Sequence, residues 1–162
     1  KLGEMYVRGL GVKEEFSEAF KWFQLAAEQG LVAGQYGLGF LYAKGGGVPQ
    51  DYQKAVEWYR KAAGQGYAKA QDKLGYLYVM GEGIRRDYAE AARLFRESAE
   101  QGHAEAQFNL AVMYAKGEGF PADKEEADKW FRLAAEQGDT RAKKALKELQ
   151  GIRLYLNLIR VS

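Results

Sequence analysis

The sequence repeats with a period of 36 residues, and no other feature limits the possible folds as strongly. Within each copy, a tyrosine, a Gly-x-Gly segment and a Gln-Gly pair return in the same register. The tyrosines are Tyr6, Tyr42, Tyr78 and Tyr114, and the closing pairs begin at Gln29, Gln65, Gln101 and Gln137. A period of this length is typical of solenoids, in which each unit buries its apolar face by stacking on its neighbours.

Two helices are predicted in each unit, one on either side of the Gly-x-Gly segment. In the first helix, Ala106, Leu110 and Met113 follow the i, i+4, i+7 spacing of one apolar face. A glycine inside a helix costs about 1 kcal/mol relative to alanine, so Gly75 predicts the close approach of a neighbouring helix backbone. The second helix has a stripe of alanines and aromatic residues that we expect to be buried: Ala55, Trp58, Tyr59, Ala62 and Ala63.

The ends of these helices are also marked in the sequence. The Gly-x-Gly segment predicts a left-handed cap at the end of the first helix, a conformation that glycine adopts at little cost. Asp51, Asp87 and Asp123 then stand where the second helix needs an N-cap. Glu90 and Glu126 follow three residues later, as in a capping box, where the glutamate bonds back to the backbone N–H of the cap.

These boundaries divide the chain into one solenoid domain at residues 1–150 and a tail. The domain is predicted to contain a partial unit, three full units and a terminal helix: 1–30, 31–66, 67–102, 103–138 and 139–150. Residues 151–162 carry none of the repeat positions, and their apolar residues fit a strand or a helix. We interpret this tail as a cap on the last unit, as a segment that docks into a groove of its own or of a neighbouring molecule, or as a remnant foreign to the domain.

The residues that define the repeat are most complete in residues 31–66: Leu38, Gly39, Tyr42, Gly45, Gly47, Val48, Asp51, Lys54, Ala55, Trp58, Tyr59, Ala62, Ala63, Gln65 and Gly66. This pattern resembles the Sel1-like repeat family, a relative of the tetratricopeptide repeat, and the resemblance covers residues 1 to about 149. It implies an all-α fold, a right-handed α-α superhelix (solenoid), and adaptor or scaffold roles. A few positions depart from the pattern without threatening the fold: Gly34, Leu94, Ser98 and Ala111.

If the tetratricopeptide-like register holds, the first helices line a concave face, and ligand-facing positions form a stripe offset from the core. The candidate peptide-binding residues on this stripe are Tyr36, Phe40, Lys69, Asp72, Tyr76, Glu105 and Phe108. The aromatic side chains are candidate anchors and the charged ones lie on the rim, as in peptide-binding hot spots. Tyr36 and Phe108 also fit the core between units, which we favour over exposure in the groove.

Glutamines recur beside this stripe, and we interpret them as structural because they return at one repeat position: Gln35, Gln71 and Gln107. No catalytic, metal or cofactor site is predicted. The chain has no cysteine and a single histidine, His103, at a variable turn position, so neither a thiolate site nor a Ser-His-acid set is expected. The Gly-x-Gly segments follow a helix and lack the Gly-Lys-Ser or Gly-Lys-Thr sequence of a phosphate loop.

Charge and hydropathy exclude two further classes of partner from our expectation. With 24 Lys and Arg against 22 Asp and Glu, the net charge is +2, which argues against nucleic acid. No apolar run is long enough to predict insertion into a membrane.

The predicted function is therefore a non-catalytic adaptor or scaffold that binds a protein or peptide. A homodimer through a terminal face or the tail also fits the sequence. Two alternatives stay open: a structural, truncated or engineered scaffold without its own partner, and an enzyme or glycan-binding protein of cell-wall metabolism.

Overall fold

The computed structural model describes residues 16–149. The predicted positions before residue 16 and the tail at 151–162 lie outside the described residues. The chain divides into two compact units between Leu94 and Phe95. Within the described residues, each unit is built from helices joined by turns.

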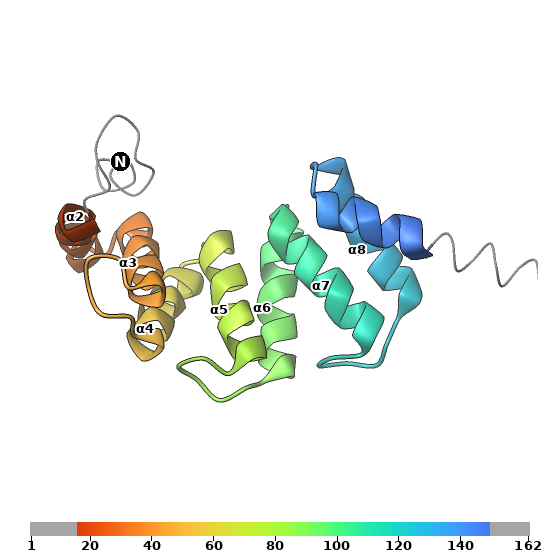
Figure 1. Ribbon diagram of the computed structural model, residues 1–162, viewed down its shortest axis with the longest axis horizontal. Coiled ribbons are helices and arrows are strands. Elements are labelled where there is room, and N and C mark those ends of the chain that lie inside the picture. Colours follow the sequence, from red (N-terminus) through yellow and green to blue (C-terminus); the bar gives the residue numbers. More distant parts are fainter. Residues whose placement is uncertain (1–15, 150–162) are drawn as a thin grey trace, which may run out of the picture. The chain divides into compact units, whose positions relative to one another are not determined.

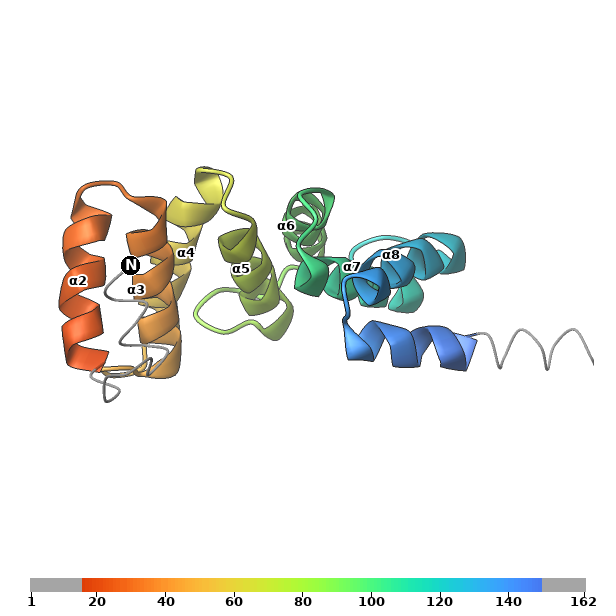
Figure 2. The ribbon, with the colours of Figure 1, turned by 90° about the horizontal axis from the view of Figure 1, so that it is seen from above.

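The first unit stacks its helices in the order in which they follow along the chain. They are α2 (Phe16–Glu28), α3 (Val32–Lys44), α4 (Tyr52–Gly64), α5 (Ala68–Met80) and the start of α6 (Tyr88–Glu100), which crosses the boundary between the units. Helix α3 packs against α2 and α4, and α4 packs against α5. Figures 1 and 2 both show α2, α3 and α4 side by side. Tight turns alternate with longer loops between them, as the helix pairs predicted from the sequence require.

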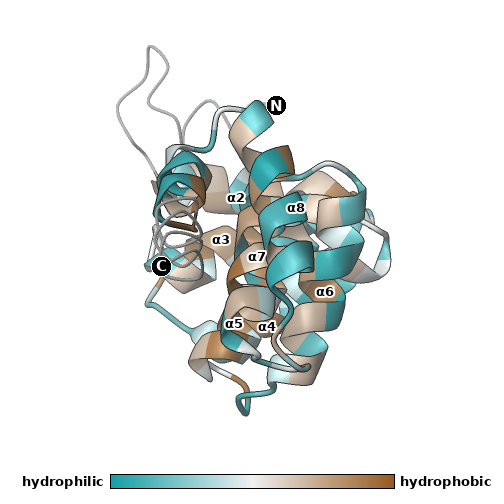
Figure 3. Cartoon of the chain, turned by 90° about the vertical axis from the view of Figure 1, so that its right-hand side faces the viewer, coloured by the Kyte–Doolittle hydropathy of each residue, from teal (hydrophilic) through white to brown (hydrophobic). Residues whose placement is uncertain are grey.

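The second unit continues the same pattern. It contains the end of α6, α7 (Ala104–Lys116), α8 (Lys124–Glu136) and a helix at residues 140–149. Helix α7 packs against α8, and α8 buries one face through Ala127, Trp130, Phe131 and Ala134. Figure 3 shows α8 alternating between hydrophilic and hydrophobic stretches, as a helix with one buried face does. The predicted all-helical, solenoid-like fold of paired helices is confirmed.

Two clusters of buried side chains form the core of the first unit. One cluster includes Tyr59 and Leu74, and the other includes Phe23 and Leu38. Leu38 is 1% exposed and Tyr59 is 2% exposed. The half-buried Phe40 packs against both clusters, so it joins them into a continuous apolar layer.

The first glycine of each Gly-x-Gly segment ends its helix as predicted. Gly45, Gly81 and Gly117 have φ angles of 72°, 72° and 73° in the left-handed region. Each donates its backbone N–H to a carbonyl in the last turn, Gly45 for example to Leu41. These bonds satisfy carbonyls that the end of a helix would otherwise leave unpaired.

The second glycine has a tertiary role that the sequence did not reveal. Gly47 has a φ of 73°, and a Cβ added there would lie 2.6 Å from the carbonyl carbon of Phe16. Gly83 lies in the same way against the backbone of Tyr52. The loop of one repeat therefore packs on the start of the second helix in the preceding repeat, and only a residue without a side chain permits this contact.

A glycine inside the first helix also marks a close approach, although not to a backbone. At Gly39, the position that corresponds to Gly75, an added Cβ would lie 2.6 Å from a ring atom of Tyr59. In this copy the neighbour is not the helix backbone that the sequence predicts, because a buried tyrosine ring from α4 fills the space.

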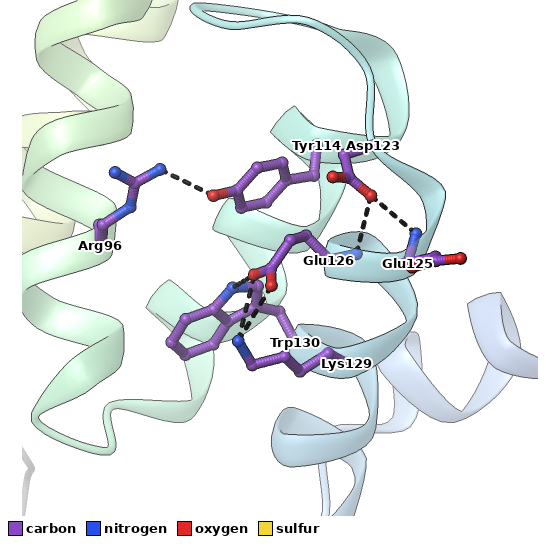
Figure 4. A network of polar contacts seen from close by, with 7 residues as sticks. All are labelled: Arg96, Tyr114, Asp123, Glu125, Glu126, Lys129 and Trp130. Atoms are coloured by element: carbon purple, nitrogen blue, oxygen red, sulfur yellow. Dashed lines mark hydrogen bonds and ion pairs between the residues drawn. The ribbon is translucent and has the colours of Figure 1, made fainter.

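The aspartates predicted as N-caps hold the second helices. Asp51 and Asp87 each accept a hydrogen bond at 3.0 Å from the backbone N–H three residues later. Asp123 accepts from the backbone of Glu125 at 2.9 Å and of Glu126 at 3.1 Å (Figure 4). The N-cap prediction is confirmed at these three positions.

The second half of the predicted capping box is wrong. The carboxylate of Glu90 pairs with Arg93 at 2.6 Å, and that of Glu126 accepts a hydrogen bond from Trp130 Nε1 at 3.0 Å. The backbone N–H of each capping aspartate donates instead to the carbonyl of a tyrosine near the end of the preceding helix, Tyr42, Tyr78 or Tyr114. With that donor already satisfied, the glutamates bond along their own helix.

Replacing Asp123 by alanine should lower the free energy of unfolding by about 1 kcal/mol, because two N–H groups of α8 lose their acceptor. Urea unfolding followed by far-ultraviolet circular dichroism measures the change. Lys124→Ala is the matched control, since this exposed neighbour begins α8 without capping it. Equal stability of the two variants would contradict the capping role.

Candidate peptide-binding surface

The seven candidate residues all lie on first helices: Tyr36 and Phe40 on α3, Lys69, Asp72 and Tyr76 on α5, and Glu105 and Phe108 on α7. Tyr36, Asp72 and Phe108 share one repeat position, since they are spaced by 36 residues. The structure places this position at the packed side of the helix, and the three residues are half-buried or buried.

Tyr36 packs between two other tyrosines. Its ring centroid lies 5.7 Å from that of Tyr59 in α4 and 5.3 Å from that of Tyr67, with the second pair edge to face. Both distances are within the range of favourable aromatic pairs. Tyr36 is therefore mainly a core residue between helices, as the sequence favoured.

Phe108 has the same packing in the second unit. Its ring centroid lies 5.6 Å from that of Phe131 in α8, and the Arg141 guanidinium covers it at 4.2 Å. Arg141 also pairs with Asp139 at 2.6 Å, and this hydrogen bond holds the pKa of Asp139 below its usual value. Phe108 is thus held between helices on one side and under a paired guanidinium on the other.

Asp72 does not lie on the rim where the sequence placed it. Its residue is 0% exposed, and its Oδ2 lies 3.2 Å from Lys73 Nζ. Burial raises the pKa of Tyr59, and the nearby Tyr36 and Asp72 raise it further. Asp72 is buried because its repeat position faces the core, where the other units place an aromatic ring.

Tyr76 is the candidate that the structure leaves most open. Its side chain is 49% exposed, although Leu74 and Leu77 on the same helix are each 3% exposed. Phe40 occupies the same repeat position on α3, yet it is half-buried between the two core clusters. Only one of the four aromatic candidates therefore has an exposed side chain.

Residues that the sequence did not single out surround Tyr76. Met80 is 43% exposed and stands four residues later, on the same face of α5. Tyr52, at the start of α4, is close enough to Tyr76 and to Glu82 to interact electrostatically with both. Partial burial and Glu82 raise the pKa of this tyrosine. We call Tyr52, Tyr76, Met80 and Glu82 the Tyr76 patch.

The i+4 spacing of Met80 from Tyr76 was visible in the sequence. The contribution of Tyr52 was not, because it comes from the next helix pair. The remaining candidates differ in exposure: Lys69 is exposed and Glu105 is half-buried.

Two of the recurring glutamines hold their helix pairs together. Gln35 Oε1 accepts a hydrogen bond from Gln65 Nε2 at 2.8 Å, and Gln107 accepts from Gln137 at the same distance. Gln35 and Gln107 are 7% and 4% exposed. The structural interpretation of these residues is confirmed, since a bound peptide could not reach them without breaking the pair.

The described residues contain no group of three or more His, Asp or Glu side chains placed to hold a metal ion. Nor does any helix between residues 16 and 149 have the length and apolarity needed to cross a membrane. His103 is half-buried at the N-cap position of α7.

Solved structures of two bacterial proteins are similar to this chain along most of its length. A protective antigen of uropathogenic Escherichia coli strains, c5321, which displays an SLR fold, matches with 42% identity and a TM-score of 0.81 over 87% of this chain and 30% of that protein. A Sel1 repeat protein from Oxalobacter formigenes matches with 37% identity and a TM-score of 0.83 over 91% of this chain and 60% of that protein. The chain thus spans less than two thirds of either protein.

The cysteine-rich protein B of Helicobacter pylori shares the fold at 21% identity, with a TM-score of 0.64 over 83% of this chain and 97% of that protein. No curated protein matches the chain. The Sel1 repeat model matches four consecutive segments, residues 1–31, 32–67, 68–103 and 104–139. The recurring glycine turns, aspartate caps and glutamine pairs described above lie in these segments, and the chain belongs to the Sel1 repeat family.

Proposed function

We propose that this chain is a non-catalytic adaptor or scaffold that binds a protein or peptide through the Tyr76 patch. Sel1 repeats typically mediate protein interactions, and the all-helical repeat fold is shared with the proteins above. The observation that carries the proposal is the exposure of Tyr76 and Met80, 49% and 43%, on a first helix whose flanking leucines are buried.

The chemistry of the patch suits a peptide ligand. Tyrosine offers a large rigid ring and a polar hydroxyl, while methionine adapts its shape to the apolar side chain that it meets. Glu82, together with the hydroxyl of Tyr52, places hydrogen-bonding groups at the edge of this apolar surface. An apolar centre with a polar edge is the usual arrangement of a binding hot spot.

A peptide selected from a displayed random library on the folded protein provides the ligand for the test. Tyr76→Ala should weaken its binding at least about tenfold, since a hot-spot aromatic residue contributes about 2 kcal/mol or more. Isothermal titration calorimetry measures the affinity, and circular dichroism checks that the helical content is unchanged.

Leu133→Ala is the matched control, because Leu133 is also a large exposed apolar residue, at 36%, but lies on the second helix α8. This variant should bind the peptide as the unchanged chain does. If Tyr76→Ala retained full affinity, the patch would not be the binding surface. If both variants lost the same affinity, the peptide would be binding to exposed apolar side chains in general.

A further inference from the structure

The loop between α5 and α6 forms a pocket of about 500 Å³, and the proposed function does not use it. It is lined by Tyr78, Ile84, Arg85, Arg86, Asp87 and Tyr88. Tyr78 follows Tyr76 by two residues on α5, so the two side chains project from nearly opposite sides of the helix. The pocket and the Tyr76 side chain therefore lie on different sides of α5.

Two arginines of this pocket are free to bind a ligand. Arg85 and Arg86 are exposed, and within residues 16–149 neither has a hydrogen bond or an ion pair from its guanidinium. Arg86 lies 5.9 Å from the centroid of the Tyr88 ring, which gives it a weak preferred position. The other arginines of the described residues are each held by a hydrogen bond: Arg60, Arg93, Arg96, Arg132 and Arg141.

Only one repeat of the chain carries arginine at both of these positions, so the repeat fold does not require the pair. The same positions hold Pro49 and Gln50 after α3, and Pro121 and Ala122 after α7. Turning and capping at this loop are thus achieved without arginine in the neighbouring repeats. A side chain that the fold does not require, placed at a pocket, is available for recognition.

The walls of the pocket define which anion fits. Asp87 contributes a carboxylate, but its Oδ1 already accepts the backbone N–H of Glu90 at 3.0 Å, at the positive end of α6. Two guanidinium groups and one carboxylate leave a net charge of 2 − 1 = +1 on the lining residues. This balance matches a singly charged carboxylate better than a doubly charged phosphate. The rings of Tyr78 and Tyr88, with Ile84, supply apolar walls for the methylene groups of a glutamate side chain.

We propose that this pocket binds the carboxylate of an acidic peptide segment, with Arg85 and Arg86 as the recognising groups. Guanidinium groups bind carboxylates through paired, charge-assisted hydrogen bonds. The two arginines lie on the loop between α5 and α6, so they add an electrostatic contact to a partner beyond those of the first helices. It does not depend on the Tyr76 patch being a binding surface.

Hexaglutamate peptide is the probe, with hexaglutamine as the neutral comparison, titrated into the ¹⁵N-labelled chain at low ionic strength. Hexaglutamate should shift the amide resonances of residues 84–88, and hexaglutamine should not. The double variant Arg85→Gln/Arg86→Gln should bind at least about tenfold more weakly, because it loses both guanidinium groups. Arg85→Lys/Arg86→Lys keeps the charge but not the forked geometry, and it should bind with intermediate affinity.

Lys143→Gln/Lys144→Gln is the matched control, since it removes the same charge from two exposed residues of the 140–149 helix. This variant should bind hexaglutamate as the unchanged chain does. The proposal is overturned if both double variants lose affinity equally, if the shifted amides lie elsewhere, or if inorganic phosphate shifts residues 84–88 at concentrations where hexaglutamate does not. Circular dichroism of each variant shows whether it keeps its helices.

Discussion

Replacing Gly47 by alanine should lower the free energy of unfolding by about 3 kcal/mol. The residue has a φ of 73°, and its added methyl group would lie 2.6 Å from the backbone carbon of Phe16 and 2.7 Å from the backbone nitrogen of Ser17. The left-handed conformation alone costs a non-glycine residue about 1–2 kcal/mol, and the overlap forces a backbone shift of about 1–3 kcal/mol more. Urea unfolding measured by circular dichroism gives the difference.

Two other glycines separate these contributions. Gly66 has a φ of 79° with no atom within 4 Å of an added Cβ, so Gly66→Ala should show the conformational cost alone, about 1 kcal/mol. Gly64 ends α4 with open space around it, and Gly64→Ala should be neutral or stabilise by up to about 1 kcal/mol. If Gly47→Ala cost no more than Gly66→Ala, the contact between the loop and Phe16 would not contribute.

The second large effect is expected at Asp72. Replacing this buried residue by alanine should destabilise the fold by about 2–4 kcal/mol, because it leaves Lys73 without its ion-pair partner and opens a cavity. Asp72→Asn keeps the volume and most hydrogen-bonding capacity, and it should cost less than the alanine variant. Urea unfolding compares the two.

The exposed ion pair of Lys116 and Glu118 provides the control for Asp72. Its atoms are 3.8 Å apart, and the lysine side chain is 61% exposed. Lys116→Ala should change stability by no more than about 0.5 kcal/mol, since solvent screens exposed pairs. If Asp72→Ala changed the free energy of unfolding as little, burial of the Asp72 carboxylate would not strengthen its interactions.

The parts of the fold that depend on local conformation were predictable from the sequence. A left-handed turn requires glycine and an N-cap requires a short acceptor, so Gly45 and Asp51 could be assigned without knowing their neighbours. The role of Gly47 could not, because it depends on the backbone of Phe16, which lies 31 residues earlier in the chain (47 − 16 = 31). The direction of Glu126 was missed for a similar reason: the N–H it was expected to bind is taken by a carbonyl of the preceding helix.

The candidate surface was predicted less well than the fold. The tetratricopeptide-like register placed Asp72 on the rim, whereas the structure buries this residue in the core. Exposure also differs within one repeat position, as Phe40 and Tyr76 show, because it depends on the side chains in the preceding second helix. The second helix before α3 carries Phe20, which packs against the same core cluster as Phe40, whereas the second helix before α5 carries the smaller Val56 at that repeat position.

The loop contact at Gly47 and Gly83 also bears on how such a chain can change its length. Each contact joins a loop to the helix of the copy before it, so a recombination event that adds or deletes one whole 36-residue copy restores the same contact at the new joint. A duplication or deletion whose length is one residue more or less than a whole copy would shift the glycine. A residue with a side chain would then lie against the backbone at the new joint. The glycine contacts therefore tolerate the gain or loss of whole copies and select against changes of other lengths.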